Sequence, residues 1–242
     1  ISEPHRGIIE YTDYNKYGCI SEDGKALLEM EYEELRIELD GSIDAYRTSD
    51  DRKNHFELCP DFDRIIKYSD GHAVLCDMDF NQLSGEYAVI ASPGYVPPGW
   101  NGSNSYVKVD APGNQYSLVR NDSWEYGLID ISGNEIIAPE YLALGPVEAE
   151  PTVYCGGKKT NGAREFYIFK VENTSVIQTY GPYEQVYTDS GSSMLRVKYG
   201  NKWTYFDTKQ EKFISDFVYD EIYPMNNGLA WTKLGEKWGV VN

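Results

Sequence analysis

The sequence lacks a long apolar run, a disulfide framework and the common nucleotide-binding motifs. No apolar stretch approaches the roughly 20 residues that a helix needs to cross a bilayer, so we expect no membrane-spanning segment. It has no Gly-x-Ser-x-Gly nucleophile elbow, phosphate loop or dinucleotide fingerprint. Its four cysteines, Cys19, Cys59, Cys76 and Cys155, are too scattered for a disulfide scaffold, and we expect buried free thiols rather than a Cys59–Cys76 bridge.

Basic residues are also scarce. Lysine and arginine number 22 against 39 aspartates and glutamates, which gives a net charge of −17. Such a surface repels phosphate backbones, and no basic stripe compensates for it, so we expect no nucleic-acid partner. A solvated acidic surface is the favoured interpretation, and a site for a cationic partner is the alternative.

What the chain does contain is a repeat. Residues 125–141 read EYGLIDISGNEIIAPEY, and similar phrases occupy residues 16–32, 202–219 and 237–242. An aromatic residue followed by an aliphatic one three positions later marks each copy, at Tyr32, Phe62, Tyr141, Tyr183 and Tyr219. The mean spacing of roughly 37 residues is typical of propellers and repeat arrays. One mark is missing near residue 100, where residues 92–106 are interpreted as an insertion.

Within each unit the hydrophobic pattern has a period of two around Gly, Asn or Asp turns, which predicts β-hairpins. We expect hairpins near residues 8–20, 43–59, 72–91, 106–130, 153–169, 194–206 and 229–241. A short third strand follows some of them, as at residues 135–138. Residues 25–39 are also predicted as strand.

These landmark phrases resemble the bacterial WG-repeat family, whose marks are Trp-Gly, Gly, Pro and Tyr-Asp. Two copies have tyrosine in place of tryptophan, at Tyr17 and Tyr126, and one has Thr204 in place of glycine. The resemblance implies a β-rich repeat array that serves as a binding or scaffold module. It implies no catalytic residues.

We therefore predict an all-β fold of about six to seven β-hairpin units in a single array over residues 1–242. The last unit lacks its third strand, and Ile1–Pro4 or the first hairpin would complete it in a closed structure. A propeller-like ring is thus favoured over the alternative, an open β-solenoid.

The insertion supplies the candidate ligand-binding residues, Tyr95, Trp100 and Tyr106. Aromatic side chains on a loop stiffened by prolines suit a carbohydrate or peptide platform, whereas the alternative is a cover for a sheet end. By contrast, Tyr17, Tyr126, Trp203 and Trp238 recur at the repeat spacing, which predicts core positions. Gly18, Gly127 and Gly239 are expected where a backbone or ring approaches closely.

Acidic and metal-binding chemistry is not favoured. The pairs Asp61/Asp63 and Asp77/Asp79 are expected on strand faces in solvent, without the calcium-loop pattern. His5, His55 and His72 have no metal-ligand spacing, and a zinc site from His55, His72, Cys59 and Cys76 is the less favoured alternative. We expect no metal and no cofactor.

The sequence thus predicts a non-enzymatic binding or scaffold module that recognises a peptide, partner protein or surface glycan. One alternative is a glycosidase-like enzyme, which needs two acids about 5–10 Å apart with one raised pKa. The other is a structural cell-surface spacer. Because the chain starts at Ile1 rather than Met, a leader removed by processing is one interpretation, and we expect an exported or cell-surface bacterial protein.

Overall fold

The computed structural model describes residues 7–38, 42–48, 55–96, 107–108 and 116–242, and these residues form antiparallel β-sheets. The only helical element in the described part is one turn of 3₁₀ helix, η1 (Pro60–Phe62). No helix among these residues is long and apolar enough to cross a bilayer. The all-β prediction is confirmed. The chain divides into two compact units, and the described residues of the second unit are 140–242.

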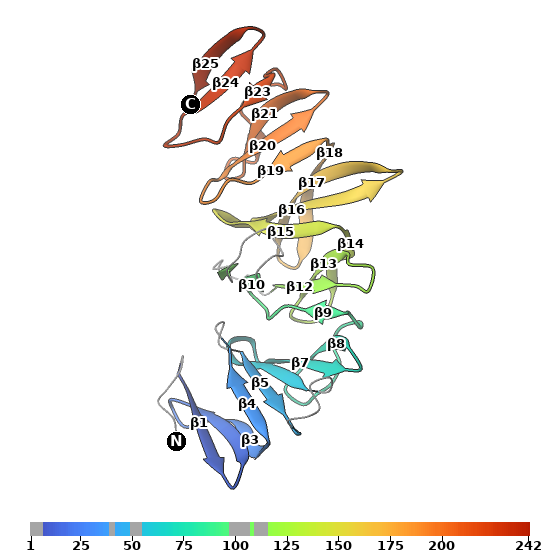
Figure 1. Ribbon diagram of the computed structural model, residues 1–242, viewed down its shortest axis with the longest axis vertical. Helices are drawn as coiled ribbons and strands as arrows, with labels where there is room; N and C mark the ends of the chain where they lie inside the picture. Colours follow the sequence, from blue (N-terminus) through green and yellow to red (C-terminus); the bar gives the residue numbers. More distant parts are fainter. Residues whose placement is uncertain (1–6, 39–41, 49–54, 97–106, 109–115) are drawn as a thin grey trace. The chain divides into compact units, whose positions relative to one another are not determined.

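The first unit contains four sheets (Figure 1). The first sheet contains β1 (Ile8–Asp13), β2 (Lys16–Ser21) and β3 (Ala26–Tyr32). The second contains β4 (Glu34–Ile37), β5 (Ile43–Tyr46), β6 (Phe56–Cys59), β7 (Arg64–Ser69) and β8 (His72–Cys76). The third has the order β14-β13-β12-β9, from β9 (Val89–Ile90), β12 (Tyr116–Arg120), β13 (Tyr126–Asp130) and β14 (Glu135–Tyr141), the last of which continues two residues into the second unit. The fourth pairs β10 (Tyr95–Val96) with β11 (Val107–Lys108).

The second unit contains three sheets whose strands follow the chain order. The first is β15 (Ala143–Val147), β16 (Glu150–Thr160), β17 (Ala163–Glu172) and β18 (Ser175–Tyr183). The next is β19 (Gln185–Tyr187), β20 (Met194–Tyr199), β21 (Lys202–Asp207) and β22 (Lys212–Phe213). The last is β23 (Glu221–Ile222), β24 (Ala230–Leu234) and β25 (Lys237–Val241). Whether the sheets form a ring or an open array stays a prediction.

The landmark tyrosine marks the boundary between consecutive sheets. Tyr32 ends β3 and Tyr183 ends β18, and in both places one residue separates that strand from the first strand of the next sheet. Tyr219 forms an isolated bridge to Trp203 just before β23. The sequence predicted the hairpins of each sheet but missed this short leading strand, because two to five residues carry little periodicity.

The missing landmark is Tyr87, and its predicted place near residue 100 was wrong. Tyr87 bridges Ala73 with backbone hydrogen bonds in both directions, of 2.7 and 3.0 Å, as Tyr219 bridges Trp203. It is followed directly by β9 of the next sheet. Phe62, which the spacing had selected, lies in η1 inside the five-stranded sheet and marks no boundary.

Most of the predicted hairpins are present, and the segment 72–91 differs. There β8 pairs with the preceding β7, and its contacts with the following residues are isolated bridges, Ala73 to Tyr87 and Cys76 to Gln82. The predicted third strand at residues 135–138 is β14, and residues 25–39 contain β3 and β4. Of the predicted insertion, Tyr95 and Val96 form β10, and residues 97–106 lie outside the described residues.

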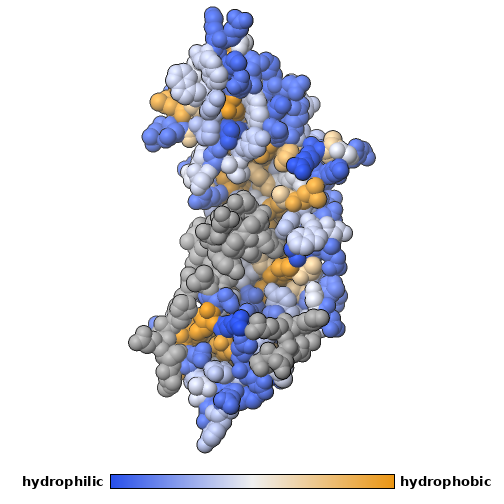
Figure 2. All heavy atoms as spheres, viewed as in Figure 1, coloured by the Kyte–Doolittle hydropathy of each residue, from blue (hydrophilic) through white to orange (hydrophobic). Residues whose placement is uncertain are grey.

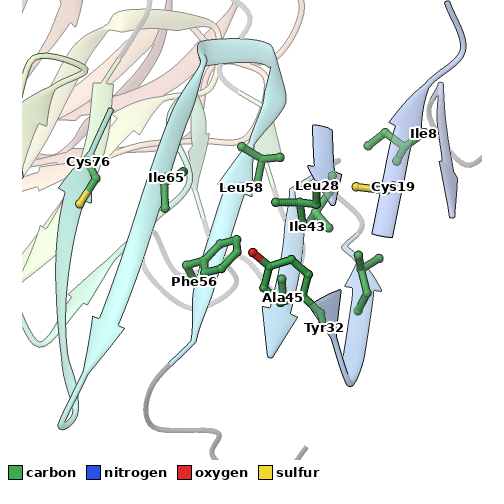
Figure 3. Close-up of a cluster of buried hydrophobic side chains, with 11 residues drawn as sticks. Ile8, Cys19, Leu28, Tyr32, Ile43, Ala45, Phe56, Leu58, Ile65 and Cys76 are labelled. Carbon is green, nitrogen blue, oxygen red and sulfur yellow. The ribbon is translucent and has the colours of Figure 1, made fainter. Parts of the chain in front are cut away.

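The core of the first unit lies on both faces of the sheet β4–β8. Ile43, Phe56, Leu58 and Cys76 pack on one face with Cys19 and Leu28 of the sheet β1–β3 (Figure 3). Cys59, Ile66 and Leu75 belong to a separate cluster with Ile90, Val119 and Ile129 of the next sheet. Strands alternate their side chains between faces, so one sheet contributes to two cores.

The same alternation of side chains determines which core cluster each cysteine joins. Cys59 and Cys76 belong to the two different clusters, and all four cysteines are free thiols. Cys19, Cys59 and Cys76 are buried, and Cys155 is half-buried. The prediction of free thiols is confirmed.

Candidate functional site

An exposed aromatic face on the sheet β23–β25 is the leading candidate site. β24 and β25 form a hairpin in which Trp231 lies opposite Val240 and Lys233 opposite Trp238. Tyr223, just after β23, donates its backbone N–H to the Trp231 carbonyl at 3.1 Å, which brings its side chain to the same face. We name this surface the terminal aromatic face; it consists of Tyr223, Leu229, Trp231, Trp238 and Val240.

These five side chains are unusually open for their size. Their exposed fractions are 51% for Tyr223, 53% for Leu229, 58% for Trp231, 47% for Trp238 and 51% for Val240. The Tyr223 and Trp238 rings lie 5.8 Å apart between centroids, at an interplanar angle of 58°. Clustered exposed apolar side chains of this kind are typical of interaction surfaces, unlike single scattered ones.

The neighbouring sheet β19–β22 has an equivalent face, in which a lysine also lies over the landmark tryptophan. There the next sheet, β23–β25, covers part of that hairpin. Tyr187 stacks on Trp203 at 5.7 Å, and Lys198 lies over Trp203 at 5.8 Å, as Lys233 lies over Trp238 at 5.5 Å. Tyr205, two residues after Trp203, is fully buried in a cluster with Ile222 and Ala230 of the sheet β23–β25.

Val240 holds the position of Tyr205 in the last sheet. Both residues follow the landmark tryptophan by two positions. In the hairpin pairing, Tyr205 lies opposite Arg196, and Val240 lies opposite Trp231. Val240 is nevertheless 51% exposed, whereas Tyr205 is 0% exposed. Within the described residues of the second unit, no sheet covers the terminal aromatic face, whereas the sheet β23–β25 covers its equivalent.

This result corrects one core prediction. Tyr17 and Trp203 are partly buried against hydrophobic clusters, and Tyr126 is half-buried. Trp238, at 47% exposed, is not a core residue. The landmark pattern is the same in each copy, and what differs is the presence of a neighbouring sheet. The sequence also did not identify Tyr223 and Trp231 as site residues, because the sequence pattern does not tell whether a neighbouring sheet covers them.

Charged groups border the aromatic face. The Lys233 ammonium donates to Glu221 Oε1 at 2.8 Å, and this carboxylate raises the pKa of Lys233. Asp220 accepts from the Lys202 ammonium and from the Gly235 N–H, and both bonds lower its pKa. The wider surface in Figure 2 is mostly hydrophilic, in agreement with the net charge of −17.

The predicted ligand-binding residues of the insertion stay untested. Tyr95 begins β10, where it pairs with Lys108. Trp100 and Tyr106 lie outside the described residues.

The two acidic pairs are not on strand faces as predicted. Asp61 lies in η1, and Asp63 is its C-cap with φ of 50°. Asp77 closes a turn, where its Oδ1 accepts the backbone N–H groups of Asp79 and Asn81, each at 2.9 Å. The bonds from Asn81 lower the pKa of Asp77, so this carboxylate organises a turn.

The alternative zinc site is wrong. His72 Nε2 lies 3.2 Å from Asp122 Oδ2, and the His55 ring stacks between Tyr46 and Tyr68. Cys59 and Cys76 belong to different core clusters. Within the described ranges, no group of three or more His, Cys, Asp or Glu side chains is placed to hold a metal ion.

One pair of acids does lie directly across two strands. Asp44 of β5 pairs with Glu57 of β6, and Glu57 accepts a hydrogen bond from the Ser92 hydroxyl. Elsewhere in the described residues, hydrogen bonds lower the pKa of the Asp23, Asp77, Glu165 and Asp220 carboxyl groups.

Comparisons with known proteins find a family that is similar to segments of this chain. The model of the WG containing repeat matches residues 126–148, which continue from the first unit into the second, and residues 203–238 of the second unit. Among solved structures, one titled as the eukaryotic initiation factor is 10% identical with a TM-score of 0.35, over 98% of this chain and 60% of that one.

A second similar structure, the WD40 domain of SCAP from fission yeast, is 11% identical with a TM-score of 0.33. That match covers 93% of this chain and 57% of the other. The chain therefore spans less than two thirds of the length of either structure. A search of the curated proteins finds no match.

Proposed function

We propose that this array of WG-containing repeats is a non-enzymatic scaffold module that binds a partner protein through the terminal aromatic face. The observation that carries the proposal is the contrast between Tyr205, which is 0% exposed, and Val240, which is 51% exposed at the equivalent position. Tryptophan and tyrosine are the residues most enriched at binding hot spots, and this face has Tyr223, Trp231 and Trp238.

The chemistry of the partner follows from the equivalent interface inside the chain. There, a sheet face with the small aliphatic residues Ile222 and Ala230 covers Tyr205. We therefore infer that the partner presents a β-sheet face of small aliphatic side chains. A large aromatic side chain buries about 150–250 Å² in full, and Tyr223, Trp231 and Trp238 are each about half exposed, so they supply part of the roughly 800 Å² per partner of a standard interface.

The experiment places a photo-crosslinking amino acid at position 229, which is 53% exposed on the same face and leaves the three aromatic residues in place. The captured partner is purified, and its affinity is measured for the wild type and for a Trp231→Ala, Trp238→Ala variant. We expect the double variant to weaken binding at least about 30-fold, because a hot-spot residue contributes 2 kcal/mol or more.

Trp124→Ala is the matched control. Trp124 is 65% exposed and lies in the first unit, with Arg120 over its ring at 3.9 Å. It should leave the partner's affinity unchanged. Equal affinities for the wild type and the double variant would contradict the proposal. A hit on a glycan array that the double variant abolishes would instead make the face a carbohydrate platform.

A further inference from the structure

A cavity of about 350 Å³ opens at one end of β5, β6 and β7 in the first unit. The residues that matter for its chemistry come from three strands and from the turn after β8. They are Arg47, His55, Phe56, Lys67, Tyr68 and Phe80. The volume is at the lower end of the range for small-molecule sites.

Aromatic rings form the walls of the cavity. Phe56 is 6% exposed, and its ring meets that of Phe80 edge to face, at 5.2 Å and 84°. Figure 3 shows Phe56 beside Tyr32 in the core of this unit. His55 stacks on Tyr68 at 4.3 Å and 7°, so a planar stack borders the same cavity. Such walls suit a small aromatic group.

Phe80 holds an unfavourable backbone conformation at this cavity. Its φ is 62°, in the left-handed region that bulky side chains rarely adopt. The turn Asp77–Asn81 repeats the hydrogen bonds of the turn Asp130–Asn134, in which glycine occupies the corresponding position, Gly133, with φ of 82°. Folding alone favours glycine here. The ring is nevertheless present, 43% exposed and directed at the cavity.

The described lining of the cavity has a charge opposite to that of the protein. Among the lining residues that the structure describes, Arg47 and Lys67 are cationic and none is acidic, in a chain of net charge −17. Arg47 pairs with Glu31 at 3.0 Å near the surface. Lys67 forms no ion pair with any carboxylate in the part of the chain that the structure describes. An anionic ligand group would supply that partner.

We infer that this cavity binds an aromatic carboxylate, with its ring against Phe56 and Phe80 and its carboxylate at Lys67 and Arg47. Two sources share this chemistry: a free aromatic acid, and a peptide that ends in an aromatic residue with a free carboxyl terminus. The inference concerns the first unit and is independent of the terminal aromatic face in the second.

The test measures binding of defined probes by calorimetry. Phenylacetate represents the free acid, phenylacetamide lacks the charge, and acetate lacks the ring. A short peptide ending in phenylalanine is compared with its C-terminal amide. We expect phenylacetate or the acid peptide to bind at least about tenfold more tightly than its neutral counterpart, since charge-assisted bonds are roughly twice as strong as neutral ones. Whichever acid binds identifies the source.

Two variants distinguish the loss of ligand binding from the loss of folding. Phe80→Gly relieves the left-handed backbone and removes one wall, so it should fold at least as stably as wild type while losing about tenfold or more in affinity. Lys67→Gln should weaken binding to a similar degree, while the control Lys25→Gln, at an exposed lysine outside the cavity, leaves it unchanged.

The inference is overturned by any of three results. These are no binding by either acid, equal binding of the acids and their neutral forms, or unchanged affinity in both cavity variants. Because Phe80→Gly is expected to keep the fold, lost binding in that variant is not explained by unfolding. None of these results bears on the partner protein of the second unit.

Discussion

The landmark glycine of the repeat is expected to be essential in one copy and dispensable in another. Gly127 and Gly239 both follow the landmark aromatic residue, Tyr126 in one case and Trp238 in the other. Sequence alone predicts equal roles for them. Their surroundings in the structure differ.

A side chain at position 127 has no room. A Cβ atom there would lie 2.6 Å from the Ile137 carbonyl oxygen and 2.8 and 2.9 Å from the N and Cα atoms of Pro139. All three are backbone atoms of β14, so no side-chain rotation relieves the overlap. At Gly239 no atom of the described residues lies within 4 Å of the added Cβ. The prediction of close approach is thus confirmed for Gly127 and wrong for Gly239.

Gly127→Ala should therefore destabilise the first unit by about 1–3 kcal/mol, the usual cost of overpacking. Gly239→Ala should change stability by no more than about 0.5 kcal/mol, because alanine meets nothing there and restricts the unfolded chain. Neither glycine has positive φ, so backbone strain does not enter the comparison.

Hydrogen exchange with mass spectrometry is the suitable assay, because it measures each unit separately. Peptides that cover residues 116–141 should exchange about fivefold faster or more in Gly127→Ala, since 1 kcal/mol changes the open population by that factor. Peptides that cover residues 230–241 should be unchanged in Gly239→Ala. Equal protection of residues 116–141 in wild type and Gly127→Ala would refute the reasoning.

Three further predictions concern turns and pH. Asp130→Ala should lower the free energy of unfolding by about 1–3 kcal/mol, because the 2%-exposed carboxylate accepts the N–H groups of Ser132 and Asn134, each at 2.8 Å. The change is measured as a lower urea midpoint at unchanged slope. A wild-type midpoint would contradict this. Hydrogen bonds lower the pKa of Asp77 and Asp220 in the folded state, so their stabilisation is present above about pH 4 and lost as the pH falls further; an unfolding midpoint that stays flat to pH 2 would exclude it. Burial raises the pKa of Cys19 and of Tyr205 to about 12 in the folded state. The stabilisation that comes from keeping these two groups neutral is therefore complete below about pH 8.5 and is lost as the pH rises toward 12. Delayed tyrosinate absorbance in the folded protein is the check.

The sequence by itself determined the local structure of this protein. Alternation with a period of two placed the hairpins at residues 8–20, 194–206 and 229–241, because it reflects which side chains face a sheet's core. The recurrence of Tyr-Gly and Trp-Gly phrases identified the repeat. The spacing did not select Tyr87. The turn before it, Asp77–Asn81, has Phe80 at the position that Gly133 holds in the turn Asp130–Asn134, so this copy lacks the glycine of the sequence pattern.

Tertiary structure decided which of these repeated residues are exposed and which are buried. Trp203 and Trp238 occupy the same place in two hairpins. Within the described residues of the second unit, a following sheet covers the hairpin of Trp203 at Tyr205, and none covers the hairpin of Trp238. The cavity likewise combines Arg47, Phe56, Lys67 and Phe80 from separate segments. A local pattern specifies which face of a strand is apolar. It does not specify what packs against that face, because that depends on contacts between residues distant in the chain.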